Sequence, residues 1–152
     1  MTALDLLHKA HFARELPESV LAKLAAIARV IEWNEGELIF REGDVQRDLF
    51  VVSSGHVVLE MNIPGRGPTR ILTVRSGELL AWSALLGKGR MTTSAITLEP
   101  TTAVAIPGDQ LLALCQSDAE VGSHVMGQVA NALSQRLVAT RLQLLDLFAK
   151  PH

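Results

Sequence analysis

The chain has 152 residues, with 14 Lys and Arg residues against 16 Asp and Glu residues and a formal net charge of −2. This length fits one ordinary domain, and a hydrophobic fraction of 48% allows a sizeable core and excludes a disordered chain. Four Phe, two Trp and no Tyr are too few aromatic rings for stacking single-stranded bases, and the near-neutral charge balance argues against a protein that coats a phosphate backbone.

The sequence shows no sign of export or of membrane insertion. Cys115 is the single cysteine, so this sequence can form neither an intrachain disulfide nor a cysteine-based metal cluster. Asp5, His8 and Lys9 interrupt the apolar segment that a signal peptide would need. No apolar run approaches the ~20 residues of a membrane span. We therefore expect a cytoplasmic protein without membrane contact.

The first part of the chain is predicted to be a helical lead over residues 1–31. The pair Pro17-Glu18 is typical of a helix start, and apolar residues then recur at spacings of three and four. They are Val20, Leu21, Leu24, Ile27, Ala28 and Ile31. This spacing predicts a helix whose apolar face packs on the rest of the domain.

From Trp33 the pattern changes to short β-rich runs that are separated by turn residues. The runs lie at 38–40, 49–52, 56–59, 71–74, 95–98 and 103–106, and Gly or Pro marks most of the turns between them. No segment long enough for a crossover helix separates the runs, which argues against parallel βαβ units. We predict an antiparallel β-barrel or sandwich over residues 33–107.

After residue 107 the helical spacing returns, and residues 109–150 are predicted to be helical. A short helix is expected at 109–116, followed by one long helix to about residue 148. The long helix carries one apolar stripe: Val121, Val125, Val129, Ala132, Leu133, Leu137, Thr140, Leu144 and Leu145. About thirty residues exceed a typical helix in a domain of this size. We expect part of the stripe to pack on the barrel and the rest to pair with a second copy, which makes a homodimer.

One segment, 76–95, departs from the alternation of strands and turns. It begins with a Gly77-Glu78 pair, continues into a short helix-forming piece and ends in a cationic Gly-rich turn at 87–90. Two interpretations stay open. The N–H groups at the helix start and a nearby carboxylate can form a cradle for an anionic ligand. Alternatively, the piece is a helical crossover that plugs one mouth of the barrel, with Trp82 as part of the core.

Three motifs follow one another along the chain: Glu-Gly-Asp at 42–44, Phe-Val-Val-Ser-Ser-Gly at 50–55 and Ser-Gly-Glu-Leu at 76–79. With the order of helices, barrel and long helix, they resemble the cyclic nucleotide-binding domain of the Crp/Fnr-type regulators. The resemblance implies an α+β, mainly β fold, a jelly-roll β-barrel flanked by N-terminal helices and one long C-terminal helix. It covers nearly the whole chain and implies a single domain over residues 1–152, with 76–95 as the phosphate-binding cassette.

The resemblance also implies roles for residues at the start of the cassette. Glu78 matches the acid that hydrogen-bonds the ribose hydroxyl, and Gly77 permits close approach of the backbone. The N–H groups around Leu80 and Ala81 would then cradle the cyclic phosphate.

The end of the cassette departs from the family pattern. The family's phosphate-binding arginine stands two residues before a small alanine; if that alanine is Ala95, the chain has Thr93 in the arginine position. Arg90, in the preceding turn, is either a substitute that reaches in or a solvated loop cation. The implied ligand-binding set is Gly77, Glu78, Leu79, Leu80, Ala81, Arg90, Thr93 and Ser94.

These observations lead to two hypotheses of function. In the first, the chain is a stand-alone sensor or regulatory domain that binds a small anionic ligand and signals through the long helix to an unidentified effector protein. The resemblance implies cAMP or cGMP as the candidate ligand. In the second, suggested by Thr93, the chain is a ligand-free interaction or dimerisation module that has kept the barrel as a scaffold.

Catalysis and direct DNA binding are not expected. The histidines are too scattered for the ligand cluster of a barrel-type metal oxygenase. They are His8, His11, His56, His124 and His152. No Gly-x-Ser-x-Gly nucleophile turn is present. The regulators that the chain resembles carry a helix-turn-helix domain after the long helix, and we expect none within this chain.

Overall fold

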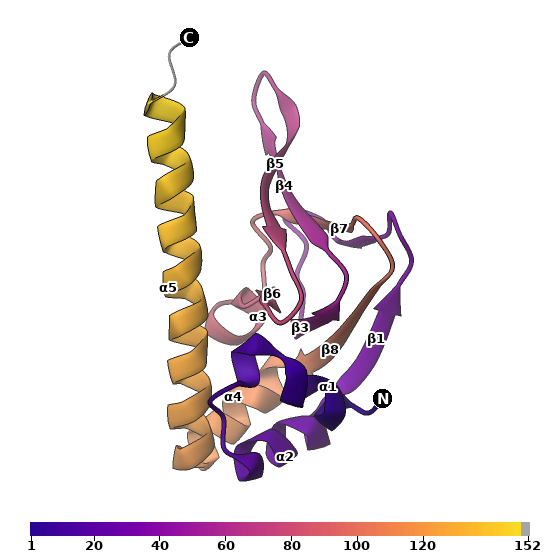
Figure 1. The fold of residues 1–152 in the computed structure, drawn as a ribbon, viewed down its shortest axis with the longest axis vertical. Coiled ribbons are helices and arrows are strands. Elements are labelled where there is room, and N and C mark those ends of the chain that lie inside the picture. The colour runs from indigo at the N-terminus through magenta and orange to yellow at the C-terminus, as the bar shows by residue number, and fades with distance from the viewer. Residues whose placement is uncertain (150–152) are drawn as a thin grey trace.

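The computed structural model describes the backbone of residues 1–149 and the side chains of residues 1–142 and of Leu145. Two four-stranded antiparallel sheets form the barrel, the short N-terminal helices lie at one end of it beside α4 (Gly108–Ser117), and a long C-terminal helix runs along one side of the molecule (Figure 1). This arrangement confirms the predicted mainly β fold with flanking helices. His152 and Leu144, named above, lie outside the residues and side chains that the structure describes.

The N-terminal region contains α1 (Ala3–Lys9), the 3-10 turn η1 (His11–Ala13) and α2 (Glu18–Ile27). Helix α2 begins directly after Pro17, as predicted. The helical lead is shorter than predicted, because residues 29–33 form strand β1 (Arg29–Trp33). The apolar spacing near Ile31 fits a helix face and a strand equally well. Pairing with the distant strand β8 decides between them, with Ile31 opposite Ala103.

The strands form two sheets with a simple division. One sheet has the order β1, β8 (Thr101–Pro107), β3 (Asp48–Ser54) and β6 (Leu79–Leu80). The other has the order β2 (Leu38–Phe40), β7 (Ser94–Thr97), β4 (Val57–Ile63) and β5 (Gly67–Val74). All six predicted runs overlap strands, whereas β6 lies where only a helix was predicted and β5 begins inside a predicted turn.

The first sheet is buried on both faces, and successive side chains of its strands point alternately to one face and the other. Phe50 and Val52 of β3 point into a cluster between the two sheets, while Leu49 and Val51 point into a second cluster beneath the helices. The second cluster also includes Leu7, Val20, Leu24, Leu111, Val121 and Val125 from the helices. The helices therefore close one face of the first sheet and fix the position of the N-terminal region on the barrel.

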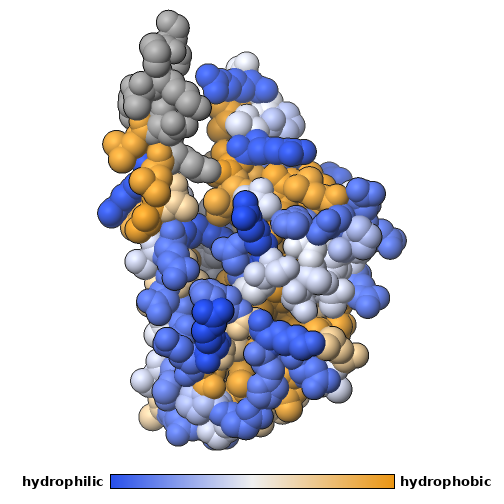
Figure 2. All heavy atoms as spheres, viewed as in Figure 1, coloured by the Kyte–Doolittle hydropathy of each residue, from blue (hydrophilic) through white to orange (hydrophobic). Residues whose placement is uncertain are grey.

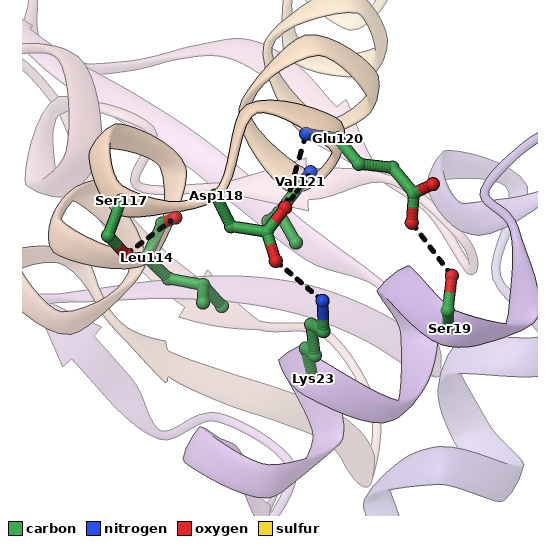
Figure 3. Close-up of polar contacts among 7 residues, drawn as sticks. All are labelled: Ser19, Lys23, Leu114, Ser117, Asp118, Glu120 and Val121. Atoms are coloured by element: carbon green, nitrogen blue, oxygen red, sulfur yellow. Dashed lines mark hydrogen bonds and ion pairs between the residues drawn. The ribbon is translucent and has the colours of Figure 1, made fainter.

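The C-terminal helices are α4 (Gly108–Ser117) and α5 (Ala119–Ala149), which agree with the prediction to within one or two residues. Asp118 separates them, and its carboxylate accepts the N–H groups of Glu120 and Val121 at 3.1 and 3.2 Å. The same carboxylate pairs with Lys23 of α2, and Ser19 of α2 donates to Glu120 at 2.8 Å (Figure 3). The start of α5 is thus fastened to α2. Within residues 1–149, no helix is both long and apolar enough to cross a membrane.

Candidate functional site

The cassette begins at a tight turn whose glycine is required by packing. Gly77 has φ +87°, and a Cβ atom on it would lie 2.8 Å from the backbone nitrogen of His11. The N–H of Phe12 donates to the Gly77 carbonyl at 3.1 Å. Gly77 therefore joins the start of the cassette to η1, which is a structural reason for a glycine at this position.

Glu78, the predicted ribose-binding acid, forms a hydrogen bond within the same turn. Its Oε1 accepts the N–H of Arg75 at 2.8 Å, and the side chain is exposed. It lines a cleft beside α5 and not the cavity that Thr93 lines. The structure does not bring Glu78 and Thr93 to one site.

Ala81 lies in the link between β6 and the four-residue helix α3 (Ser83–Leu86). Ala81 has φ 65° and is the one non-glycine residue with positive φ among residues 1–149. This left-handed conformation costs an L-residue about 1–2 kcal/mol, so the surrounding packing must hold it. Ala81 is 6% exposed, which agrees with a residue held by its neighbours.

A small cavity of about 30 Å³ lies between the cassette and strands β2 and β4. Its wall consists of Phe40, Leu59, Leu80, Ala81, Trp82, Ser83, Met91, Thr92 and Thr93. None of these residues carries a charge, and only the hydroxyl groups and the backbone offer hydrogen bonds. Small-molecule pockets usually have about 300–1,000 Å³, so a nucleotide needs the cassette to open.

Arg90 and Ser94 face a different neighbour, the loop at 41–45. The Arg90 guanidinium donates to the carbonyl of Gly43 at 2.9 Å, and the Ser94 hydroxyl accepts the N–H of Glu42 at 2.9 Å. The Glu-Gly-Asp motif that marked the resemblance is therefore held in place by these two cassette residues. Of the eight predicted binding residues, Leu80, Ala81 and Thr93 line the cassette cavity. Gly77, Glu78 and Leu79 line the cleft beside α5, so the predicted set is divided among three places.

That cleft is the larger space, about 270 Å³, between η1, β5, the turn before β6 and α5. Its polar wall comes from His11, Arg14, Glu15, Thr73, Glu78, Gln128, Asn131, Gln135 and Arg136. Sequence reasoning named three of its wall residues, Gly77, Glu78 and Leu79. It missed the rest, because residues of the N-terminal turn and of α5 are more than a hundred positions apart. The available signal was the group of amides and Arg136 beside the apolar stripe of the long helix.

Arg136 connects α5 with the cassette. Its Nη2 donates to the Leu79 carbonyl at 3.0 Å, and its guanidinium carbon lies 4.4 Å from the centre of the Trp82 ring. Burial lowers the pKa of Arg136, while the charge of Glu78 opposes this shift, and the guanidinium stays protonated. Its Nη1 is buried and has no hydrogen-bond acceptor within the described part of the chain.

Comparison with known proteins matches this architecture. Residues 30–118, more than half of the chain, match the family described as the cyclic nucleotide-binding domain. The chain is 29% identical over 119 residues to the cyclic AMP receptor protein of Thermus thermophilus, and the match covers 78% of this chain and 55% of that relative. The chain therefore spans little more than half the length of this curated relative.

Two solved structures are similar over most of their length. A candidate cyclic nucleotide-binding protein from Geobacter metallireducens has a TM-score of 0.78 and 25% identity, with 90% of this chain and 99% of that chain covered. A cyclic nucleotide-binding domain from Methylobacillus flagellatus has a TM-score of 0.82 and 19% identity, with 98% of this chain and 84% of that chain covered. The second likeness concerns the fold alone. With the family match, the two sheets, the cassette and the flanking helices identify the chain as a member of the cyclic nucleotide-binding domain family.

Proposed function

We propose that this chain is a ligand-sensing regulatory domain, not an enzyme, which binds a small anionic ligand at the cassette and signals through α5. The observation that supports it most is the double contact of Arg136 with the Leu79 carbonyl and the Trp82 ring. Opening of the cassette moves both of these partners and so changes the packing of α5. The ligand shifts α5 only as far as its affinities for the two arrangements differ.

The proposed ligand is a cyclic nucleotide, cAMP or cGMP. Membership of the family supports this class, and the name of the Thermus thermophilus relative supports cAMP. A cyclic phosphate carries one negative charge, and Thr93 offers it a hydroxyl group in place of a cation. A missing charge-assisted hydrogen bond, about 1.5–3 kcal/mol, weakens binding by roughly one to two decades. Weak binding is therefore expected in the natural chain.

The decisive experiment adds the cation. Thr93→Arg should tighten the binding of cAMP or cGMP by roughly ten- to a hundredfold relative to the natural chain, as measured by titration calorimetry. Ser123→Arg is the matched control, because Ser123 is exposed at the start of α5 and outside the cassette. If a folded Thr93→Arg variant gives no heat of binding with either nucleotide at millimolar concentration, the proposal of a cyclic-nucleotide ligand is wrong.

The output side of the proposal is a homodimer formed through the C-terminal half of α5. Four large apolar side chains are exposed there, namely Leu137 (53%), Val138 (49%), Leu142 (61%) and Leu145 (64%). Figure 2 shows hydrophobic side chains gathered along the upper part of this helix. We propose that α5 of a second copy packs against these side chains. An unidentified effector protein then receives the signal. We further propose that residues 1–152 act as one cytoplasmic domain.

A second candidate function is a ligand-free dimerisation module. The uncharged wall and the volume of about 30 Å³ of the cassette cavity favour it. This version predicts an unchanged melting temperature across a panel of nucleotides, together with intact assembly through α5. A melting temperature that rises with one nucleotide contradicts it, because a ligand at a hundred times its dissociation constant adds about 2.7 kcal/mol of stability.

A further inference from the structure

The cleft beside α5 has the features of a binding site that is separate from the cassette cavity. We propose that it binds a small monoanion, a molecule with one carboxylate or one singly charged phosphate group, against Arg136. The cleft and the cassette cavity have no wall residue in common among the described residues, and Thr93 lines only the cavity. The proposal therefore goes beyond the cyclic-nucleotide function and does not depend on it.

The face of α5 toward the cleft is polar, where a helix that packs on its own domain is normally apolar. Gln128, Asn131 and Gln135 lie at successive positions of one helix face and all line the cleft. On the neighbouring face of α5, Val121, Val125 and Val129 fill the core. Three carboxamides offer both donors and acceptors, which fix the orientation of a polar ligand in a pocket.

The anionic group of the ligand is indicated by Arg136. One face of its guanidinium lies over Trp82, and Nη2 is engaged with Leu79. Nη1 is buried without an acceptor, although a buried donor of a charged group normally has one. Neither Glu15 nor Glu78 forms an ion pair with Arg136 among the described residues, and Glu78 instead caps the turn at Arg75. A carboxylate or phosphate oxygen supplies the missing acceptor.

The charges around the cleft select a monoanion. Arg14 and Arg136 are positive and Glu15 and Glu78 negative, but only Arg136 is largely withdrawn from solvent. A charge away from water acts through a lower effective dielectric, whereas salt screens the exposed rim. The floor of the cleft therefore attracts one negative charge, and the two rim carboxylates oppose a second. The volume of about 270 Å³ restricts the ligand to a small molecule.

Binding should be visible at the Trp82 ring. Because Nη1 is covered, an oxygen reaches it only after a local shift of the guanidinium, and this shift alters the stacking on Trp82. The chain has two tryptophans. The other, Trp33, stacks edge-on against Phe50 at 5.2 Å in the barrel and serves as an internal reference.

The experiment titrates the ¹⁵N-labelled full chain with acetate and, separately, with dimethyl phosphate, each compared with chloride at equal ionic strength. A saturable shift of the Trp82 indole N–H signal with an unmoved Trp33 signal is the expected result. Acetate alone identifies a carboxylate ligand, dimethyl phosphate alone a phosphate ligand, and both the shared anion chemistry. Equal shifts with chloride, or no saturation with either probe, overturn the proposal.

Substitutions in the cleft wall test whether the acetate or dimethyl phosphate binds in the cleft. Arg136→Gln should weaken its affinity at least about tenfold, and Asn131→Asp, which adds a charge at an exposed position of the cleft wall, should weaken it several-fold without loss of folding. Ser123→Asp, with the same gain of negative charge outside the cleft, should bind as the natural chain does. An unchanged affinity in Asn131→Asp overturns the site. Tighter probe binding in Thr93→Arg places the anion in the cassette, which overturns the cleft site and leaves the cyclic-nucleotide function standing.

Discussion

The two halves of α5 have the same kind of sequence and opposite surroundings. Val121, Val125 and Val129 in the first half are at most 1% exposed, whereas Leu137 and Leu142 in the second half are 53% and 61% exposed. The change occurs around Arg136, where the helix passes the cassette. One continuous apolar stripe is therefore buried in the core in its first half and exposed in its second half. Periodicity identifies the face of a helix, but it does not say which surface lies against that face.

Neighbouring elements explain the difference. The first half packs against α4, α2 and η1, and Lys23 and Ser19 of α2 hold its first turn. The second half extends beyond the short N-terminal helices (Figure 1). Its large apolar residues are exposed, whereas Gln135, Arg136 and Ala139 line the cleft. A perturbation of the first half should therefore damage folding, and one of the second half should damage assembly.

The largest expected effect concerns assembly. Leu142→Glu places a carboxylate in each of the two copies of a symmetric interface, where it must lose its hydration. We expect dimer dissociation to become at least a hundredfold easier, about 2.7 kcal/mol, with a lower molecular mass by light scattering. Ser123→Glu is the control on the first half of α5. An unaltered mass in Leu142→Glu means that another surface forms the dimer, or that the chain is monomeric.

The next largest effect concerns the stability of the fold, and the same substitution, Val to Ala, is made in each half of α5. Val125→Ala removes two buried methyl groups and leaves a cavity, which should lower the free energy of unfolding by about 2 kcal/mol. Val138→Ala, at a position 49% exposed, should change it by less than about 0.5 kcal/mol. Urea unfolding at low protein concentration measures both values without a contribution from dimerisation. Equal losses at the two positions would show that the second half of α5 also packs within the monomer.

The strands and helices were largely predictable because turn residues and apolar spacing are local signals. The run at 103–106 needed no distant information, and β8 lies where that run was found. Strand β6 was missed because it has two residues, and pairing with Phe50 and Val51 of β3 is what makes it a strand. Strand β1 was missed because it also depends on a distant partner: β8 supplies its hydrogen bonds.

The binding residues were harder to predict than the fold. Ala81 takes a left-handed conformation that an alanine gives no sign of in a sequence, and the chain direction after it depends on that angle. Glu78 and Thr93 therefore looked like parts of one site although they line different spaces. The cleft needs His11 and Arg136 together, and only the packing of η1 against α5 brings them to one wall.

The smallest effect concerns the contact that fastens the first half of α5. The Lys23 ammonium holds the pKa of the Asp118 carboxyl below its ordinary value, and Asp118 raises the pKa of Lys23. Asp118→Asn keeps a good helix cap and removes the charge, so at neutral pH it should lower the melting temperature slightly. Asp118 contributes its stability above the ordinary carboxyl pKa of about 3.9 and loses it as the pH falls through the lowered value.

The melting temperatures of Asp118→Asn and the natural chain should therefore converge in acid, and added salt should narrow their difference at neutral pH. Glu35→Gln is the control, because it removes one exposed carboxylate outside α2, α4 and α5. A difference that persists below the lowered pKa means that the substitution acts through the cap hydrogen bonds at the start of α5 and not through the charge pair with Lys23. In that case the packing of Val121, Val125 and Val129 in the core, together with the cap at Asp118, holds the first half of α5 in place, and the contrast with the exposed half is one of packing.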